Sequence, residues 1–167
     1  MVALSILSNI EAFQGLSQRQ LIKLEPYCEA LAYRQGDQLF AEGEPAMHLW
    51  VVLEGRVDLR FEMPDKRLAS EHHTVTSSEA GHRDNVGQTF GWSCFVPPHQ
   101  MRLSAYCVTD ECRVVRIARE DLLRLFDYDP HMGYVFLTYL IKVVGYRFHQ
   151  FQEVVAKHMG EYLMYGW

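Results

Sequence analysis

The chain has 167 residues, of which 49% are hydrophobic and 22% charged, and it carries a formal net charge of -5. This composition indicates one globular domain large enough to bury a core, and it excludes a disordered chain. The negative charge gives no electrostatic reason to expect a nucleic-acid surface. No apolar run approaches the roughly 20 residues that cross a bilayer, and the first residues lack the pattern of a secretory signal, so we expect a cytoplasmic protein.

Residues 1–29 are predicted to form a helical segment. Ser17 and Gln20 have the spacing of a capping box at the start of a helix. The apolar residues that follow have helical spacing up to Tyr27, where Pro26 blurs the end of the pattern. We expect this segment to pack against the rest of the domain.

Residues 30–117 are predicted to be rich in strands. Short hydrophobic or alternating runs, separated by turn residues, are typical of an antiparallel β jelly-roll barrel. The predicted strands are Ala30 to Tyr33, Gln38 to Phe40, His48 to Leu53, Arg56 to Phe61, Leu103 to Val108 and Arg113 to Ile117. Between them, the polar stretch from Pro64 to Asn85 is predicted to be a long hairpin or loop.

Residues 118–160 are predicted to be helical again, with a short helix from Arg119 to Asp127 and a long one that begins at Asp129-Pro130. Apolar residues recur at steps of three and four up to a predicted stop near Gly160. Such a helix is about 40 Å long, more than one small domain covers, so we expect a homodimer. The residues assigned to the contact with the second copy are Met132, Phe136, Leu140, Val143, Phe148 and Phe151. The alternative is a helix that lies wholly on its own barrel.

Three stretches, Gly36 to Pro45, Leu53 to Val57 and Gly87 to Trp92, place glycine where the chain must turn sharply. Together these stretches resemble those of the cyclic-nucleotide-binding domain family, in the form found in catabolite activators. The resemblance extends from about Phe13 to Phe151 and implies a mainly β sensor domain with flanking helices. It also implies a small anionic ligand, either a cyclic nucleotide or another small anion, and no further cofactor.

In the family resembled, a phosphate-binding segment follows a Phe-Gly-Glu motif, and its backbone N–H groups and one arginine hold the cyclic phosphate. Here Phe90 and Gly91 are followed by Trp92 and Ser93, so a tryptophan replaces the glutamate that accepts from the ribose hydroxyl. The indole only donates, and an unsatisfied hydroxyl costs about 1–3 kcal/mol. Trp92 therefore stacks on a ligand base, plugs the pocket or packs against a partner.

Arg102 falls at, or within one residue of, the position of the family's phosphate arginine. Leu103 separates Arg102 from Ser104, whereas the family has a small residue directly after the arginine. The alternative for Arg102 is a solvated strand residue. The candidate ligand-binding residues are Phe90, Gly91, Trp92, Ser93, Arg102 and Ser104.

Other chemistry finds little support in the sequence. Four scattered cysteines without a CxxC pair, Cys28, Cys94, Cys107 and Cys112, indicate buried thiols. His72, His73 and His82 lack accompanying ligands, so we expect no metal, and no nucleophile elbow or Walker loop is present, so we expect no catalysis. His131, His149 and His158, on the last predicted helix, are interpreted as solvent-facing and not as haem ligands.

The seven residues after Gly160, an aromatic tail over 161–167, are too few for a recognition helix, so we expect no direct DNA binding. We interpret the chain as a stand-alone, dimeric sensor or regulatory module that binds a small anion and signals through a protein partner. The alternative hypothesis is a domain without a ligand that acts as a dimeric interaction scaffold.

Overall fold

The computed structural model describes residues 2–62 and 89–165. Its N-terminal part contains α1 (Leu4–Leu7), η1 (Glu11–Phe13), α2 (Gln18–Leu24) and η2 (Glu25–Tyr27), where η denotes a 3-10 helix. The capping box is confirmed, because the Ser17 hydroxyl accepts from the Gln20 N–H and the Gln20 side chain accepts from the Ser17 N–H. The α-helix stops at Leu24 and not at Tyr27, since Pro26 has no N–H to continue it.

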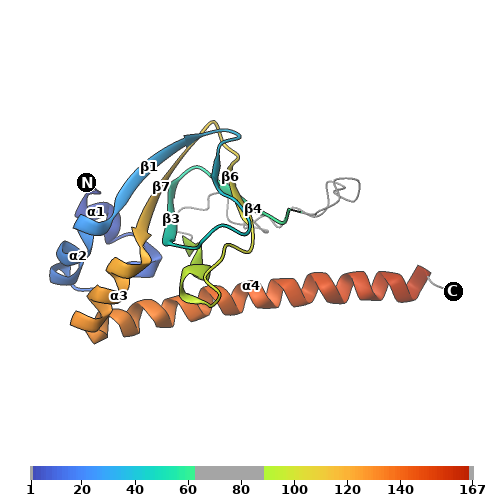
Figure 1. The fold of residues 1–167 in the computed structure, drawn as a ribbon. Helices are drawn as coiled ribbons and strands as arrows, with labels where there is room; N and C mark the ends of the chain where they lie inside the picture. Colours follow the sequence, from blue (N-terminus) through green and yellow to red (C-terminus); the bar gives the residue numbers. More distant parts are fainter. Residues whose placement is uncertain (1, 63–88, 166–167) are drawn as a thin grey trace.

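Two antiparallel sheets follow (Figure 1). One contains β1 (Glu29–Arg34), β7 (Glu111–Ala118), β3 (His48–Glu54) and β5 (Thr89–Phe90), in that order. The other contains β2 (Gln38–Phe40), β6 (Ser104–Cys107) and β4 (Val57–Arg60). The six predicted strands are confirmed to within about two residues at each end. Over the described residues, no ladder joins the two sheets into a closed barrel.

An aromatic cluster joins the two sheets. Phe40 of β2 has its ring centroid 5.7 Å from that of Trp50 in β3 and 6.0 Å from that of Phe90 in β5. Trp50 and Phe90 are register partners in neighbouring strands and stack on each other. All three side chains are buried, so this cluster forms the core directly behind the Phe90-Gly91 turn.

Helix α3 (Arg119–Tyr128) leads into helix α4 (Pro130–Tyr165), which is 36 residues long. The Asp129 carboxylate accepts from the Met132 N–H at 3.2 Å and from Gln20 Nε2 at 3.0 Å, which fixes the start of α4 against α2. The predicted stop near Gly160 was wrong, because α4 continues to Tyr165 and takes up most of the predicted aromatic tail. At about 1.5 Å per residue, α4 is about 54 Å long.

The first half of α4 lies on its own domain. Met132, Phe136 and Leu140 are buried, and the Phe136 ring contacts the rings of Phe13 and Phe126. The assignment of these three residues to an intermolecular contact was therefore wrong. The helix has two apolar faces, and the sequence pattern did not distinguish the face that packs on the domain from the face that is exposed. The second half of α4 extends past the sheets (Figure 1), and every described side chain from Phe148 onward is exposed.

The four cysteines are free and buried, as predicted. Burial raises the pKa of the Cys28 and Cys94 thiols to about 12, which keeps them protonated and unreactive. Among the described helices, none is long and apolar enough to cross a membrane. The predicted loop from Pro64 to Asn85, with His72, His73 and His82, lies outside the described residues.

Candidate functional site

The turn after β5 is built around Gly91, which has a left-handed backbone conformation with φ of 74°. A Cβ atom at this position would lie 2.7 Å from Trp50 Cδ1 and 3.0 Å from the His48 carbonyl oxygen. Position 91 therefore requires glycine both for its backbone angles and for space. The 3-10 helix η4 (Trp92–Phe95) starts immediately after it.

The predicted site residues around this turn have different environments. Phe90 is 3% exposed and belongs to the aromatic cluster, so its role is to hold the turn. Ser93 is buried, and Trp92 is half-buried with its ring packed against the core. In η4 the Cys94 N–H donates to the Gly91 carbonyl oxygen, so the N–H groups of Trp92 and Ser93 precede the first hydrogen bond of the turn.

A second segment, Gly43 to Ala46, holds the loop that leaves η4. The Gly43 N–H donates to the Met101 carbonyl, and the Met101 N–H donates to the Glu44 carbonyl, each at 2.8 Å. The Ala46 N–H donates to the carbonyl of His99, a non-glycine residue with φ of 58°. No local sequence pattern links these two segments, although the Gly-Glu-Pro sequence at Gly43 indicates a tight turn.

Arg102 lies in the bend before β6, and its exposed side chain forms no hydrogen bond or ion pair with any described residue. Leu103, half-buried, packs against the core instead. Leu103 directly precedes Ser104 and Ala105 of β6, which are both buried, so the buried part of the chain begins immediately after Arg102.

Ser104 is completely buried, and its hydroxyl accepts from the Glu42 N–H at 2.9 Å. It thus connects the strand β6 to the segment that holds the η4 loop. The structure places Phe90, Gly91, Trp92 and Ser93 in one turn, whereas no hydrogen bond or ion pair of the described residues joins Arg102 or Ser104 to that turn.

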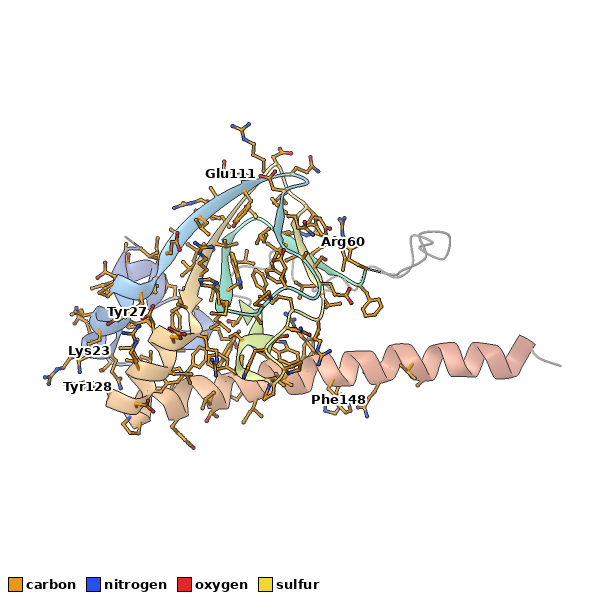
Figure 2. The ribbon with its side chains drawn as sticks, in the orientation of Figure 1. Lys23, Tyr27, Arg60, Glu111, Tyr128 and Phe148 are labelled. Carbon is orange, nitrogen blue, oxygen red and sulfur yellow. The ribbon has the colours of Figure 1, made fainter. Side chains whose placement is uncertain are left out.

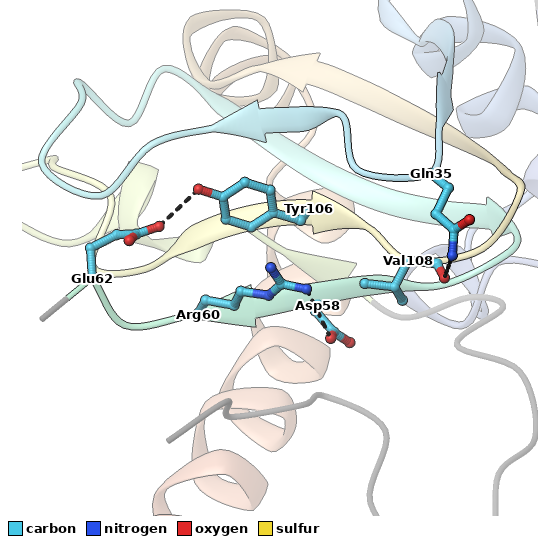
Figure 3. A network of polar contacts seen from close by, with 6 residues as sticks. All are labelled: Gln35, Asp58, Arg60, Glu62, Tyr106 and Val108. Carbon is cyan, nitrogen blue, oxygen red and sulfur yellow. Dashed lines mark hydrogen bonds and ion pairs between the residues drawn. The ribbon is translucent and has the colours of Figure 1, made fainter. Parts of the chain in front are cut away.

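A polar network covers the other face of β6 (Figure 3). The Tyr106 hydroxyl donates to Glu62 Oε1 at 2.8 Å, as Figure 3 shows. The same hydroxyl accepts from Gln38 Nε2 at 2.8 Å. The Arg60 guanidinium lies over the Tyr106 ring, 4.7 Å from its centroid, and pairs with Asp58 at 3.8 Å. Burial, followed by the hydrogen bond to Glu62, raises the pKa of Tyr106.

Helix α4 contacts the strand before the turn. Arg147 Nη2 donates to the Thr89 carbonyl oxygen at 3.4 Å, and burial lowers the pKa of this guanidinium. Tyr139, half-buried on α4, has its pKa raised by burial. The Gly91 turn is thereby connected through β5 to the long helix.

A separate groove with a volume of about 620 Å³ lies between the first sheet and the helical segments beside it. It is formed by η2, the starts of β1 and β3, the end of β7 and the start of α3. Its ionisable side chains are Glu25, Glu29, His48, Arg116 and Asp121. Within residues 2–62 and 89–165, no cluster of three or more histidine, cysteine or acidic residues is arranged to hold a metal ion.

The family model of the cyclic nucleotide-binding domain matches residues 30–129. The chain belongs to this family, which confirms the resemblance seen in the glycine motifs. The match covers both sheets, the Gly91 turn and helix α3.

Several solved structures have a similar fold. A putative cyclic nucleotide-binding protein from Geobacter metallireducens GS-15 is 23% identical, with a TM-score of 0.70 over 89% of this chain and 100% of that chain. A cyclic nucleotide-binding domain from Methylobacillus flagellatus KT is 22% identical, with a TM-score of 0.70 over 92% and 81% of the two chains. The regulatory domain of Toxoplasma gondii PKA, crystallised with cAMP, is 15% identical, with a TM-score of 0.63 over 85% and 48%. A comparison with curated proteins gave no match.

Proposed function

We propose that this chain is a regulatory sensor module that binds a small anionic ligand beside the Gly91 turn. The observation that carries the proposal is the turn itself, because the left-handed Gly91 opens η4 with two N–H groups not used in its first hydrogen bond. Backbone N–H groups in such a turn attract an anion. Arg102, exposed and unpaired among the described residues, supplies the positive charge for the same anion.

The ligand class follows from the family and from Trp92. A cyclic nucleotide supplies the phosphate that the turn and Arg102 would hold, and one structural neighbour was crystallised with cAMP. Trp92 stands where the resembled motif has its glutamate, so a ribose hydroxyl at this place has no carboxylate acceptor. In this proposal the half-buried indole stacks on the base or closes the pocket, and Ser104 positions the loop through Glu42.

We also propose that the domain is a jelly roll and that α4 is its dimerisation helix, through a face that differs from the one buried in the domain. Exposed apolar residues on α4 recur with the seven-residue spacing of a coiled coil. They are Tyr134, Leu137, Ile141, Phe148 and Val155. Of the other residues that the sequence assigned to the dimer contact, Phe148 belongs to this exposed face and Val143 is half-buried. The side chain of Phe151 is outside the part of the chain that the structure describes. Figure 2 shows Phe148 on the side of α4 away from the sheets.

In this proposal the chain is not an enzyme, and it acts on a protein partner from the cytoplasm without direct DNA contact. Support comes from the connection between turn and helix, since Arg147 of α4 donates to Thr89 two residues before Gly91. A ligand at the turn and a second copy on α4 thus act on the same structural unit.

The test is the thermal unfolding midpoint with and without cyclic mononucleotides and dinucleotides at about 1 mM. A ligand whose Kd is a hundredfold lower stabilises the fold by about 2.7 kcal/mol, a shift of several degrees. We expect the shift to disappear in Arg102→Ala and to persist in Arg19→Ala, which removes an exposed arginine on α2. No shift with any compound, or an unchanged shift in Arg102→Ala, would contradict the proposed site and favour the scaffold hypothesis.

A further inference from the structure

Strand β1 is the outer strand of its sheet, and one of its sides has no strand partner in the described part of the chain. The direction of its backbone groups follows from two hydrogen bonds. The Gln35 N–H donates to the Asp110 carbonyl, toward the β7 side, whereas the Arg34 N–H donates to Asp37 Oδ2, away from it. Because successive residues of an antiparallel strand alternate, Ala30 and Ala32 direct their N–H and C=O groups to the free side.

This free edge carries few of the features that normally prevent pairing with another strand. Ala30 and Ala32 are exposed and have small side chains, and the register between β1 and β7 is continuous without a bulge. The segment contains no proline, and its charged residues, Glu29 and Arg34, stand only at its two ends. An exposed edge of this kind is a template for an added strand.

The groove described above continues from the first residues of this edge. Glu29 and Ala30 of β1 line the groove together with Glu25 and Asp121. Tyr27, which also lines the groove, is labelled in Figure 2 and shows at which end of the molecule the groove lies. Arg116 is paired with Glu29 at 2.6 Å, and burial, followed by the neighbouring Arg116, lowers the pKa of His48 and favours its neutral form. Asp121 pairs with Arg124, so Glu25 is the one acidic side chain of the groove without an ion pair among the described residues. A basic side chain is therefore favoured beside Glu25.

We propose that the β1 edge is a docking site for an extended segment of a partner protein, which pairs antiparallel with Ala30 and Ala32 and places an arginine or lysine in the groove. An antiparallel added strand has its C-terminal end at Glu29, so the basic residue lies at the C-terminal end of that segment. Main-chain hydrogen bonds supply the affinity, and the acidic groove supplies the selectivity. The inference is independent of ligand binding at the Gly91 turn.

The test is amide hydrogen exchange of the full chain, measured by NMR, with a peptide of about six residues in which threonine and valine alternate before a C-terminal arginine. We expect the Ala30 and Ala32 amides to exchange at least about tenfold more slowly with saturating peptide. The Leu31 amide, already directed toward β7, serves as the internal control. A matched peptide that ends in glutamate should give no protection.

Three results would overturn the proposal. They are unchanged exchange at Ala30 and Ala32, equal protection by the glutamate peptide, and protection without peptide that rises with protein concentration. The last would mean that a second copy of the chain occupies the edge.

Two variants test the charge of the groove. Glu25→Gln removes one acidic group that lines it and should weaken binding of the arginine peptide about two- to fivefold. Glu44→Gln makes the same chemical change at an exposed residue outside the groove and should leave affinity unchanged. Equal affinity in both variants would contradict the predicted position of the basic residue.

Discussion

The indole of Trp50 occupies the space that a side chain at position 91 would need, with Cδ1 only 2.7 Å from the Cβ atom of a residue there. We expect Gly91→Ala to lower the free energy of unfolding by at least about 2 kcal/mol, because strain at positive φ adds to a contact with a buried ring. Gly36→Ala is the matched control, since Gly36 has φ of 88° with nothing within 4 Å of its Cβ. That variant should lose only about 1 kcal/mol.

Urea unfolding of both variants measures the difference. Equal losses would show that the Trp50 ring moves aside without cost. The turn would then be less rigid than its packing against the aromatic cluster indicates.

The two faces of α4 should respond differently to truncation. Phe136 is 1% exposed, and its ring lies among those of Phe13, Phe95 and Phe126, so Phe136→Ala should cost about 3–5 kcal/mol of stability. Tyr134→Ala, at a side chain that is 71% exposed, should cost less than about 0.5 kcal/mol in the monomer. A large loss in Tyr134→Ala, measured by urea unfolding at low protein concentration, would contradict the assignment of the faces.

Self-association should depend on the exposed face of α4. Ile141 is 72% exposed at the centre of the seven-residue spacing, so Ile141→Gln should shift the protein toward monomer in sedimentation equilibrium. Lys142→Gln changes the next, also exposed residue and should leave the association constant unchanged. If the unmodified chain is already monomeric at about 0.1 mM, the proposed dimer is wrong.

Acid should weaken the junction between α3 and α4 through Asp129. The hydrogen bond from Gln20, followed by the one from the Met132 N–H, lowers the pKa of this carboxyl group. A lowered folded-state pKa gives stability that is present above the ordinary aspartate pKa and is lost as the pH falls through the folded value. We therefore expect the free energy of unfolding to decrease less between neutral pH and about pH 3 in Asp129→Asn than in the unmodified chain.

Asp127→Asn provides the control for that measurement. Asp127 is exposed, two residues away, and forms no hydrogen bond or ion pair with a described residue. An equal flattening in this variant would assign the acid sensitivity to general charge and not to the Asp129 cap.

Local sequence signals were sufficient for most of the fold. The capping box at Ser17, the strand from Gln38 to Phe40 and the start of α4 at Asp129-Pro130 each depend on neighbouring residues, and the structure confirms them. Strand β5 was missed because its two residues, Thr89 and Phe90, carry no alternating pattern and depend on pairing with β3.

The candidate site was less predictable because it depends on contacts between distant segments. The sequence places Leu103 beside Arg102, but only the structure shows that Leu103 packs against the core while Arg102 is exposed. The faces of α4 posed the same difficulty, since both are apolar. Burial of Phe136 and exposure of Ile141 separate them only once the position of the helix on the domain is known.

Helix α4 is held on one half and free on the other, which gives it the geometry of a lever. Among the described residues, its last hydrogen bond to the sheets joins Arg147 to Thr89, 18 residues before the end of the helix at Tyr165, or about 27 Å along the axis. A tilt of about 5° at the Gly91 turn would displace the free end by about 2 Å, comparable to known helix shifts at subunit interfaces. A rearrangement too small to alter the fold of the domain is thereby magnified at the far tip of the helix.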